Sequence, residues 1–258
     1  MTSFLESIGN VFIRLFEETG LWFSMLWRTA AWSVRPPFEI REWLRQAVRV
    51  GVDSIPVVFL TSMFTGMVLA LQTYTGFHRV HAENFVGSVV ALAMLRELSP
   101  VLVGLMVTGR VGSSMAAEIG TMRVTEQIDA LEALATDPVQ YLFVPRVIAG
   151  IVMLPFLVIL GDALGIGGGY LVAVRLLNAN PVQYQINTYQ FLEMNDLWSG
   201  LIKAAVFGLI LTLTGCVRGY TTSGGAEGVG RATTSAVVNA SLLILLSDFF
   251  LTKLLFTA

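Results

Sequence analysis

Long stretches of this chain carry almost no charge. Residues 54–77 contain no formally charged side chain, and this run exceeds the about 20 residues that a helix needs to cross a hydrocarbon core of about 30 Å. Four further runs are also long enough, and one or two charges interrupt each of them: 84–109, 147–174, 197–217 and 232–258. We therefore predict an all-α integral membrane protein with five transmembrane helices.

The basic residues are distributed unevenly between the two sides of these spans. The N-terminal region and the segments 110–146 and 218–231 together hold 11 arginines, whereas the opposite side holds only Arg79, Arg175 and Lys253. Segments rich in Lys and Arg stay in the cytoplasm. We therefore expect a cytoplasmic N-terminus and a periplasmic C-terminus.

Residues 1–34 show an amphipathic pattern instead. Four of the five tryptophans lie in or just after this region, and an indole ring sits best at the level of the lipid headgroups. We predict a helix in the membrane interface, with a sixth spanning helix as the alternative, and a break at Pro36-Pro37. The apolar stripe comprises Phe4, Ile8, Val11, Phe12, Leu15, Phe16, Trp22, Phe23, Leu26 and Trp27.

The chain then divides into two parts, an interfacial helix with its connector (1–49) and a five-helix domain (50–258). Within the second part, the segment 118–137 has an apolar stripe at Val124, Ile128, Leu131 and Leu134. This spacing predicts a short amphipathic helix that ends at Asp137-Pro138. The stripe itself is compatible with packing on the same protein and with docking of a soluble partner.

The composition excludes two broad classes of function. Apolar residues make up 55% of the chain and charged residues 13%, against about 45–50% and about 25% in average soluble domains. An ordinary soluble enzyme is therefore excluded. The net charge of −2 provides no basic surface for a nucleic acid. The single cysteine, Cys216, cannot form an internal disulfide.

Four charged residues lie within the predicted spans at similar depths: Arg96, Glu97, Lys203 and Asp248. Each costs about 2.5–3.5 kcal/mol at the centre of a membrane helix, so such groups face a partner or a wet cavity. Two interpretations remain open. The four residues form either a neutral network that joins helices, or a polar patch in a substrate cavity.

Asp162 is a fifth charge within the spans, and it lies in a Gly161-x-x-x-Gly165-x-x-x-Gly169 pattern. Small residues four apart let two helices approach closely, which predicts close packing of the third span. His78-x-x-His81-x-Glu83 has the spacing of metal ligands, but no fourth ligand is evident. We therefore expect solvated loop histidines and no metal site.

The chain lacks a phosphate-binding loop. That motif requires Gly-Lys followed by Ser or Thr, and the two lysines, Lys203 and Lys253, are followed by Ala and Leu. We therefore expect no enzyme activity and no nucleotide or other cofactor in this chain. If ATP powers its function, another subunit must hydrolyse it.

Four segments resemble the signature of the MlaE permeases. The longest is 109–132, GRVGSSMAAEIGTMRVTEQIDALE, and the others are 66–72, GMVLALQ, 95–100, LRELSP, and 226–234, AEGVGRATT. They occur in family order and cover most of the chain from residue 50 onward. MlaE permeases are membrane subunits of the ABC transporters that work with MCE proteins to maintain lipid asymmetry.

The resemblance implies a homodimeric permease in the inner membrane of a Gram-negative bacterium. Its partners would be cytoplasmic ABC ATPase subunits that bind ATP and Mg, a small accessory subunit in the cytoplasm, and a periplasmic ring of MCE subunits. The substrate would be a phospholipid. A non-transporting membrane scaffold and a homo-oligomeric channel are the alternatives from other functional classes.

The resemblance also implies roles for individual residues. The lipid pocket would be lined by Leu69, Gln72, Tyr74, Phe77 and Val80 in its upper part, with Arg96, Glu97, Lys203 and Asp248 nearby. The segment from Glu118 to Glu132 would be the coupling helix that docks on the ATPase. Its coupling residues would be Glu118, Gly120, Met122, Arg123, Glu126, Asp129 and Leu131. Asp162 matches no acidic position of the family.

Overall fold

A computed structural model describes residues 2–36, 39–79 and 82–257, and these residues form helices and connections without a β-strand. The α-helices are α1 (Thr2–Ser33), α2 (Ile40–Val50), α3 (Ile55–His78), α4 (Val86–Ala93), α5 (Ser99–Val107), α6 (Ser113–Val124), α7 (Gln127–Ala133), α8 (Val144–Leu171), α9 (Pro181–Phe191), α10 (Met194–Tyr220) and α11 (Gly225–Thr257). Short 3₁₀ turns are η1 (Val52–Ser54) and η2 (Glu83–Phe85), and π-helical turns are η3 (Met94–Leu98), η4 (Thr108–Gly112), η5 (Val139–Phe143) and η6 (Val172–Leu176).

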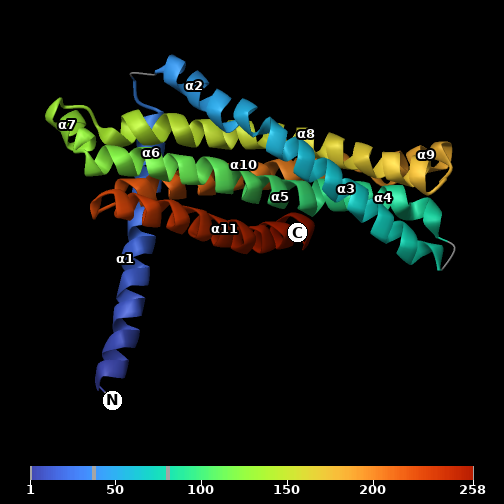
Figure 1. The fold of residues 1–258 in the computed structure, drawn as a ribbon, viewed down its shortest axis with the longest axis horizontal. Helices are drawn as coiled ribbons and strands as arrows, with labels where there is room; N and C mark the ends of the chain where they lie inside the picture. The colour runs from blue at the N-terminus through green and yellow to red at the C-terminus, as the bar shows by residue number, and fades with distance from the viewer. Residues whose placement is uncertain (1, 37–38, 80–81, 258) are drawn as a thin grey trace.

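Five helical segments of the described chain are long and apolar enough to span a membrane, as the sequence predicts. They comprise Ile40–His78, Glu83–Val124, Val139–Leu176, Met194–Tyr220 and Gly225–Phe256. All five run side by side along the long axis of the molecule, with α7 at one end and α9 at the other (Figure 1). We call these the α7 end and the α9 end.

The segments are longer than the charge-free runs because the helices continue past the charged residues at their ends. The first segment is an example: α2 leads through η1 into α3, so residues 40–49 of the predicted connector belong to the same helical segment.

The N-terminal helix α1 crosses the direction of the bundle instead of following it (Figure 1). Trp22, Met25 and Leu26 pack against the core, and the Trp22 indole N–H donates to Thr214 Oγ1 at 3.2 Å. Glu18 forms an ion pair with Arg218 of α10 at 2.5 Å. This orientation is that expected of an interfacial helix. The side chains of Phe4, Ile8, Val11, Phe12 and Leu15 lie outside the described part.

Close packing of α3 on α8 confirms the expectation from the glycine pattern. A Cβ added to Gly66 would collide with the carbonyl group of Gly165, and one added to Gly168 would lie 2.6 Å from the carbonyl oxygen of Met63. Two helices approach this closely only where side chains are absent from the contact. Helix α10 lies at the centre of the bundle, and most of its residues are buried.

The predicted single helix over 118–137 is wrong. Residues 118–124 belong to α6, the last part of the segment Glu83–Val124, and the separate helix α7 covers only Gln127–Ala133. The chain turns at Thr125 and Glu126, and Glu126 adopts a left-handed conformation with φ 60°. A left-handed residue cannot continue a right-handed helix, so the apolar stripe is distributed over two helices.

Candidate functional site

The ammonium group of Lys203 is the centre of a charge cluster between α10, η3 and α11. Lys203 is completely buried, and its Nζ donates to Glu97 Oε2 at 2.7 Å and to Thr252 Oγ1 at 2.7 Å. The same Nζ lies 3.0 Å from Asp248 Oδ1, and this contact is an ion pair without hydrogen-bond geometry. A buried ammonium is stable only with such partners.

A backbone carbonyl completes the surroundings of Lys203. Its Nζ donates to the carbonyl oxygen of Arg96 at 3.0 Å. In an α-helix this oxygen would accept from the residue four positions later, but that residue is Pro100, which has no N–H. The chain instead forms the π-helical turn η3 here. The sequence Arg-Glu-Leu-Ser-Pro therefore supplies both a carboxylate and an accessible carbonyl to the lysine.

Arg96 pairs with a residue that the sequence analysis did not single out. Its Nε donates to Asp196 Oδ1 at 2.6 Å, and its Nη2 lies 2.5 Å from the same oxygen. The guanidinium carbon lies 4.6 Å from the ring centre of Phe256. Asp196 also accepts from the Glu193 backbone N–H at 3.0 Å, so it caps α10. It lies one residue before the predicted fourth span, and for that reason the search for charges within spans did not include it.

The five charged groups of the cluster do not balance. Arg96 and Lys203 provide two positive charges, and Glu97, Asp196 and Asp248 provide three negative ones. Their exposure differs as well: the side chains of Lys203 and Asp196 are 0% and 1% exposed, whereas those of Arg96 and Glu97 are each 39% exposed. The cluster thus has a dry interior that joins helices and an accessible rim with one guanidinium and one carboxylate.

The residues expected to line the upper pocket lie on the last turns of α3. Leu69, Tyr74 and Phe77 pack against a second apolar core with Val86, Val90 and Met94, and Gln72 is exposed. No hydrogen bond or ion pair joins these four residues to the charge cluster within the described chain. Val80 lies outside the described residues.

Glu118, the first of the expected coupling residues, pairs with its own chain. Its carboxylate lies 3.1 Å from Arg49 of α2 and 3.0 Å from Arg146 of α8, whose side chain is buried. Gly120 also faces inward, because a Cβ there would lie 3.0 Å from Thr222 Oγ1. These two residues hold α6 against its neighbours.

The remaining expected coupling residues surround α7. Arg123 pairs with Asp129 at 2.6 Å and lies over the ring of Tyr220, while Met122 and Leu131 pack against the core. Ile128 is fully buried. The apolar stripe therefore packs on its own protein as far as Leu131, but Leu134 is 76% exposed. Glu126, Asp129 and Leu134 mark the accessible face of this helix.

Asp162 does not join the charge cluster. It is buried on α8, and its Oδ1 atom has no hydrogen-bond partner within the described chain. At the α9 end, His78 Nδ1 lies 2.6 Å from Glu83 Oε1, and the ring of Tyr74 stacks on the His78 ring. The described residues contain no group of three or more potential metal ligands, and His81 lies outside them.

Comparison with known proteins identifies the family. The model of the permease MlaE matches residues 43–254, which include three of the five spans completely and nearly all of the first and the last. The chain belongs to the MlaE permease family. Its relatives include a probable ABC transporter permease protein of Rickettsia typhi, 50% identical over 96% of both chains.

Two further relatives extend the comparison. The intermembrane phospholipid transport system permease protein MlaE of Haemophilus influenzae is 36% identical over 100% of this chain and 99% of its own length. The chloroplastic protein TRIGALACTOSYLDIACYLGLYCEROL 1 of Arabidopsis thaliana is 41% identical over 84% of this chain and 62% of its own length. This chain is thus a multi-pass membrane protein and the permease of an ABC transporter.

Proposed function

We propose that this chain moves phospholipid between the inner membrane of a Gram-negative bacterium and a periplasmic MCE partner. The observation that carries the proposal is the accessible rim of the charge cluster, where Arg96 and Glu97 are exposed beside a completely buried Lys203. The name of the Haemophilus relative, an intermembrane phospholipid transport permease, supports phospholipid as the substrate.

The rim matches the two charges of a phospholipid headgroup. The guanidinium of Arg96 has donors left after its contact with Asp196, because Arg carries five N–H donors, and a phosphate accepts such donors in pairs. Glu97 would attract an ammonium group. The buried pairs with Lys203 and Asp196 hold both rim groups in place, so a headgroup meets preorganised charges.

The energy would come from a separate ATPase that binds ATP and Mg, because this chain has no phosphate-binding loop. We place its docking surface on the accessible face of α7, around Glu126, Asp129 and Leu134. A small accessory subunit would bind to that assembly. Figure 1 shows α7 projecting from one end of the bundle, where a soluble partner can reach it.

The homodimer would form through an apolar face that the single chain leaves open. Most of the apolar residues of helix α11 are not buried inside the chain. Its exposed side chains include Val238, Leu242, Leu246, Phe249 and Phe250. Two copies that meet at this face would place their charge clusters on the two sides of one cavity.

A lipid-transfer assay on the reconstituted complex tests the proposal. The double variant Arg96→Gln/Asp196→Asn removes one cation and one carboxylate, so neither charge is left without its partner. We expect this variant to fold but to transfer lipid at least about tenfold more slowly. The reason is that the charge-assisted hydrogen bond from Arg96 to the lipid phosphate is lost. The matched control is Arg45→Gln/Glu42→Gln, which removes an exposed ion pair of α2 and should transfer lipid normally.

Normal transfer by the folded Arg96/Asp196 variant would contradict the proposed role of the rim. Absence of transfer by the wild-type complex, with intact assembly, would favour a scaffold. Ion conductance of the purified chain in a planar bilayer would favour a channel.

A further inference from the structure

A buried carboxyl group without a counterion lies on α8. Asp162 is 5% exposed, its Oδ1 atom accepts no hydrogen bond within the described chain, and no charged group there acts on it. Ionisable residues inside a membrane bundle normally pair with one another or mark a polar pathway. The charge cluster around Lys203 does not include Asp162, so this carboxyl group requires an explanation of its own.

Three helices meet at Asp162. On α3, the Ser62 hydroxyl packs against the preceding residue of α8, because a Cβ added to Gly161 would lie 2.9 Å from Ser62 Oγ. On α5, the Ser99 side chain interacts with the Asp162 carboxyl group itself, and Val103 Cγ2, one turn later, would lie 3.2 Å from the same added Cβ. The absence of a side chain at Gly161 therefore lets both helices reach α8 beside the carboxyl group.

The two hydroxyl groups beside Asp162 also have unused hydrogen-bonding capacity. Ser62 and Ser99 are 1% and 0% exposed, and neither Oγ atom forms a hydrogen bond of normal geometry within the described chain. Nearly all buried polar groups are paired. A carboxylate only accepts, and each hydroxyl has one proton to donate, so this contact is short of donors. A proton on the carboxyl group would add a donor and also remove the charge, whereas a water molecule would leave the charge in place.

Helices α3, α4 and α5 bring no counterion to Asp162, because they contain no Asp, Glu, Lys or Arg. The ionisable side chains of α3, Tyr74 and His78, lie near its last turn, towards the α9 end, and Arg175 of η6 lies at that end as well. The charged side chains that η3, α10 and α11 place in the membrane are partners of one another in the charge cluster: Arg96, Glu97, Asp196, Lys203 and Asp248.

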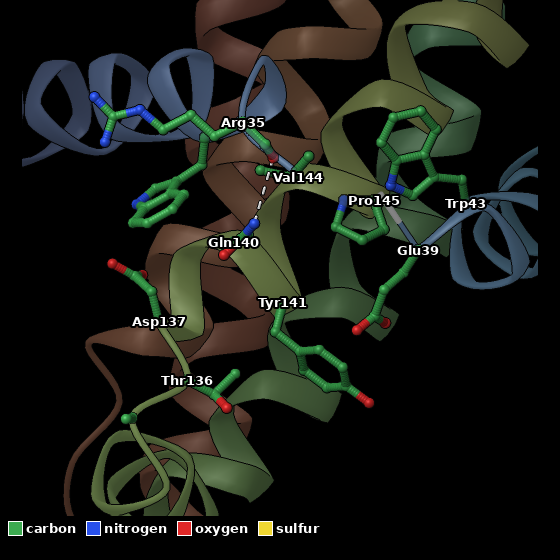
Figure 2. A pocket seen from close by; sticks show the side chains of 11 residues that line it. Arg35, Glu39, Trp43, Thr136, Asp137, Gln140, Tyr141, Val144 and Pro145 are labelled. Carbon is green, nitrogen blue, oxygen red and sulfur yellow. Dashed lines mark hydrogen bonds between the residues drawn. The ribbon is translucent and has the colours of Figure 1, made fainter. Parts of the chain in front are cut away.

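The other charged groups that pack on α8 gather at its first turn. Figure 2 shows Arg35, Glu39 and Asp137 around the pocket at the α7 end, which Pro145 also lines. Pro145 lies 17 residues before Asp162, which corresponds to about 25 Å along the helix. The same end holds the ionisable groups that α1, α2, α10 and the start of α8 contribute: Glu18, Arg49, Arg146, Cys216, Arg218 and Tyr220.

We propose that Asp162 is a proton-binding site and that the bound proton keeps α3, α5 and α8 in contact. A buried, unpaired carboxylate costs far more than a neutral carboxylic acid, and such a group takes up a proton instead. The acid would donate to one serine hydroxyl, which can in turn donate to a further acceptor. Loss of the proton would place a negative charge in this contact and draw water or a cation between the helices.

This position connects the proton with the charge cluster. Ser99 faces α8, whereas its neighbour Pro100 faces α10, where its Cγ atom would lie 3.4 Å from a Cβ added to Gly200. Glu97, which pairs with Lys203, lies two residues before Ser99. A shift of α5 away from α8 would therefore move the segment that supplies this carboxylate. An effect on lipid transport rests on the proposed function, whereas proton binding does not.

The first test measures the protonation of Asp162 directly. The purified full-length chain, prepared with isotope-labelled aspartate, is studied in lipid nanodiscs by infrared spectroscopy, because a protonated carboxyl group has a C=O stretching band that a carboxylate lacks. At neutral pH, the difference spectrum of wild type minus Asp162→Asn should contain this band and no carboxylate bands. The matched control is Asp129→Asn, which removes an exposed partner of Arg123, and its difference spectrum should contain carboxylate bands only.

The second test is the pH dependence of unfolding in the same membrane-mimetic system. If the native state holds a proton that the unfolded chain releases, the unfolding equilibrium constant should increase by up to about tenfold per pH unit as the pH rises. Asp162→Asn is neutral at every pH, so it should lose this component and be at least as stable as wild type at alkaline pH. Asp129→Asn should keep the wild-type dependence.

Carboxylate bands in the difference spectrum of Asp162→Asn at neutral pH would overturn the proposal, and so would a wild-type pH dependence in this variant. Failure of Asp162→Asn to fold would also contradict it, because the amide has the shape and neutrality of the protonated acid. Stabilisation of wild type, but not of the variant, by Na⁺ relative to choline would identify a cation site instead. Neither test uses the ATPase or lipid transfer, so their failure is distinguishable from failure of the proposed function.

Discussion

Replacement of Lys203 by methionine keeps an unbranched side chain one heavy atom shorter, but it removes the only cation of the described chain in contact with both Glu97 and Asp248. The variant strands two carboxylates, and they are not equally buried. The Asp248 side chain is 19% exposed, whereas that of Glu97 is 39% exposed. Water can therefore compensate Glu97 better than Asp248.

These exposures set the expected magnitudes. Breaking a buried pair by removing one partner costs about 3–5 kcal/mol, and we expect Lys203→Met to reduce the free energy of unfolding by that amount. Adding Asp248→Leu removes the more buried stranded charge and should recover about 1–3 kcal/mol, the range of coupling between contacting residues. Adding Glu97→Gln instead should recover less.

The assay is unfolding of the purified chain in mixed micelles at increasing dodecyl sulfate, followed by circular dichroism. Wild type, the three single variants and the two double variants complete both mutant cycles. Wild-type stability of Lys203→Met would refute the reasoning that its ammonium is essential to the cluster. Strictly additive effects in both cycles would show that these charges do not interact.

Three further predictions concern other parts of the chain. Leu131→Glu should unfold the region around α7 because this side chain packs on the core, whereas Leu134→Glu should leave folding intact and weaken co-purification of the ATPase. Gly66→Ala should cost about 1–3 kcal/mol in the same unfolding assay because the α8 backbone occupies the space of its Cβ, and Gly76→Ala, which meets open space, is the control. The hydrogen bond from Arg218 lowers the pKa of the Glu18 carboxyl. The contribution of this ion pair to the docking of α1 should therefore be present above the ordinary carboxyl pKa and disappear as the pH falls through the lowered pKa. Proteolytic release of α1 should increase over that pH range, and Glu18→Gln should abolish this pH dependence.

The number of spans could be predicted from sequence because charge is expensive in a hydrocarbon core. Long charge-free runs have few alternatives to a spanning helix. The same cost explains why Lys203, Glu97 and Asp248 meet, since each needs a partner. The ends of the helices could not be read in this way, because charged residues at a helix end are solvated and carry no such cost.

The details of the site required the structure for two reasons. Asp196 lies at the end of a span, where a charge is ordinary, so only three-dimensional proximity reveals it as the partner of Arg96. The apolar stripe of residues 124–134 has a helical period, but periodicity does not show that Glu126 turns the chain. Nor does it show which side of a stripe meets its own protein, and here only Leu134 remains accessible.

Lys203 has more acceptors within reach than protons to donate. An ammonium carries three N–H bonds, and these are directed to Glu97, Thr252 and the Arg96 carbonyl oxygen. Asp248 Oδ1 lies 3.0 Å from the same nitrogen but accepts no hydrogen bond. If α11 slides along its neighbours, one bond can pass from Thr252 to Asp248 on the same helix, and the number of hydrogen bonds stays constant. Asp248 and Thr252 lie one helical turn apart on α11, so the buried ammonium has an alternative acceptor on that helix without the loss of a hydrogen bond.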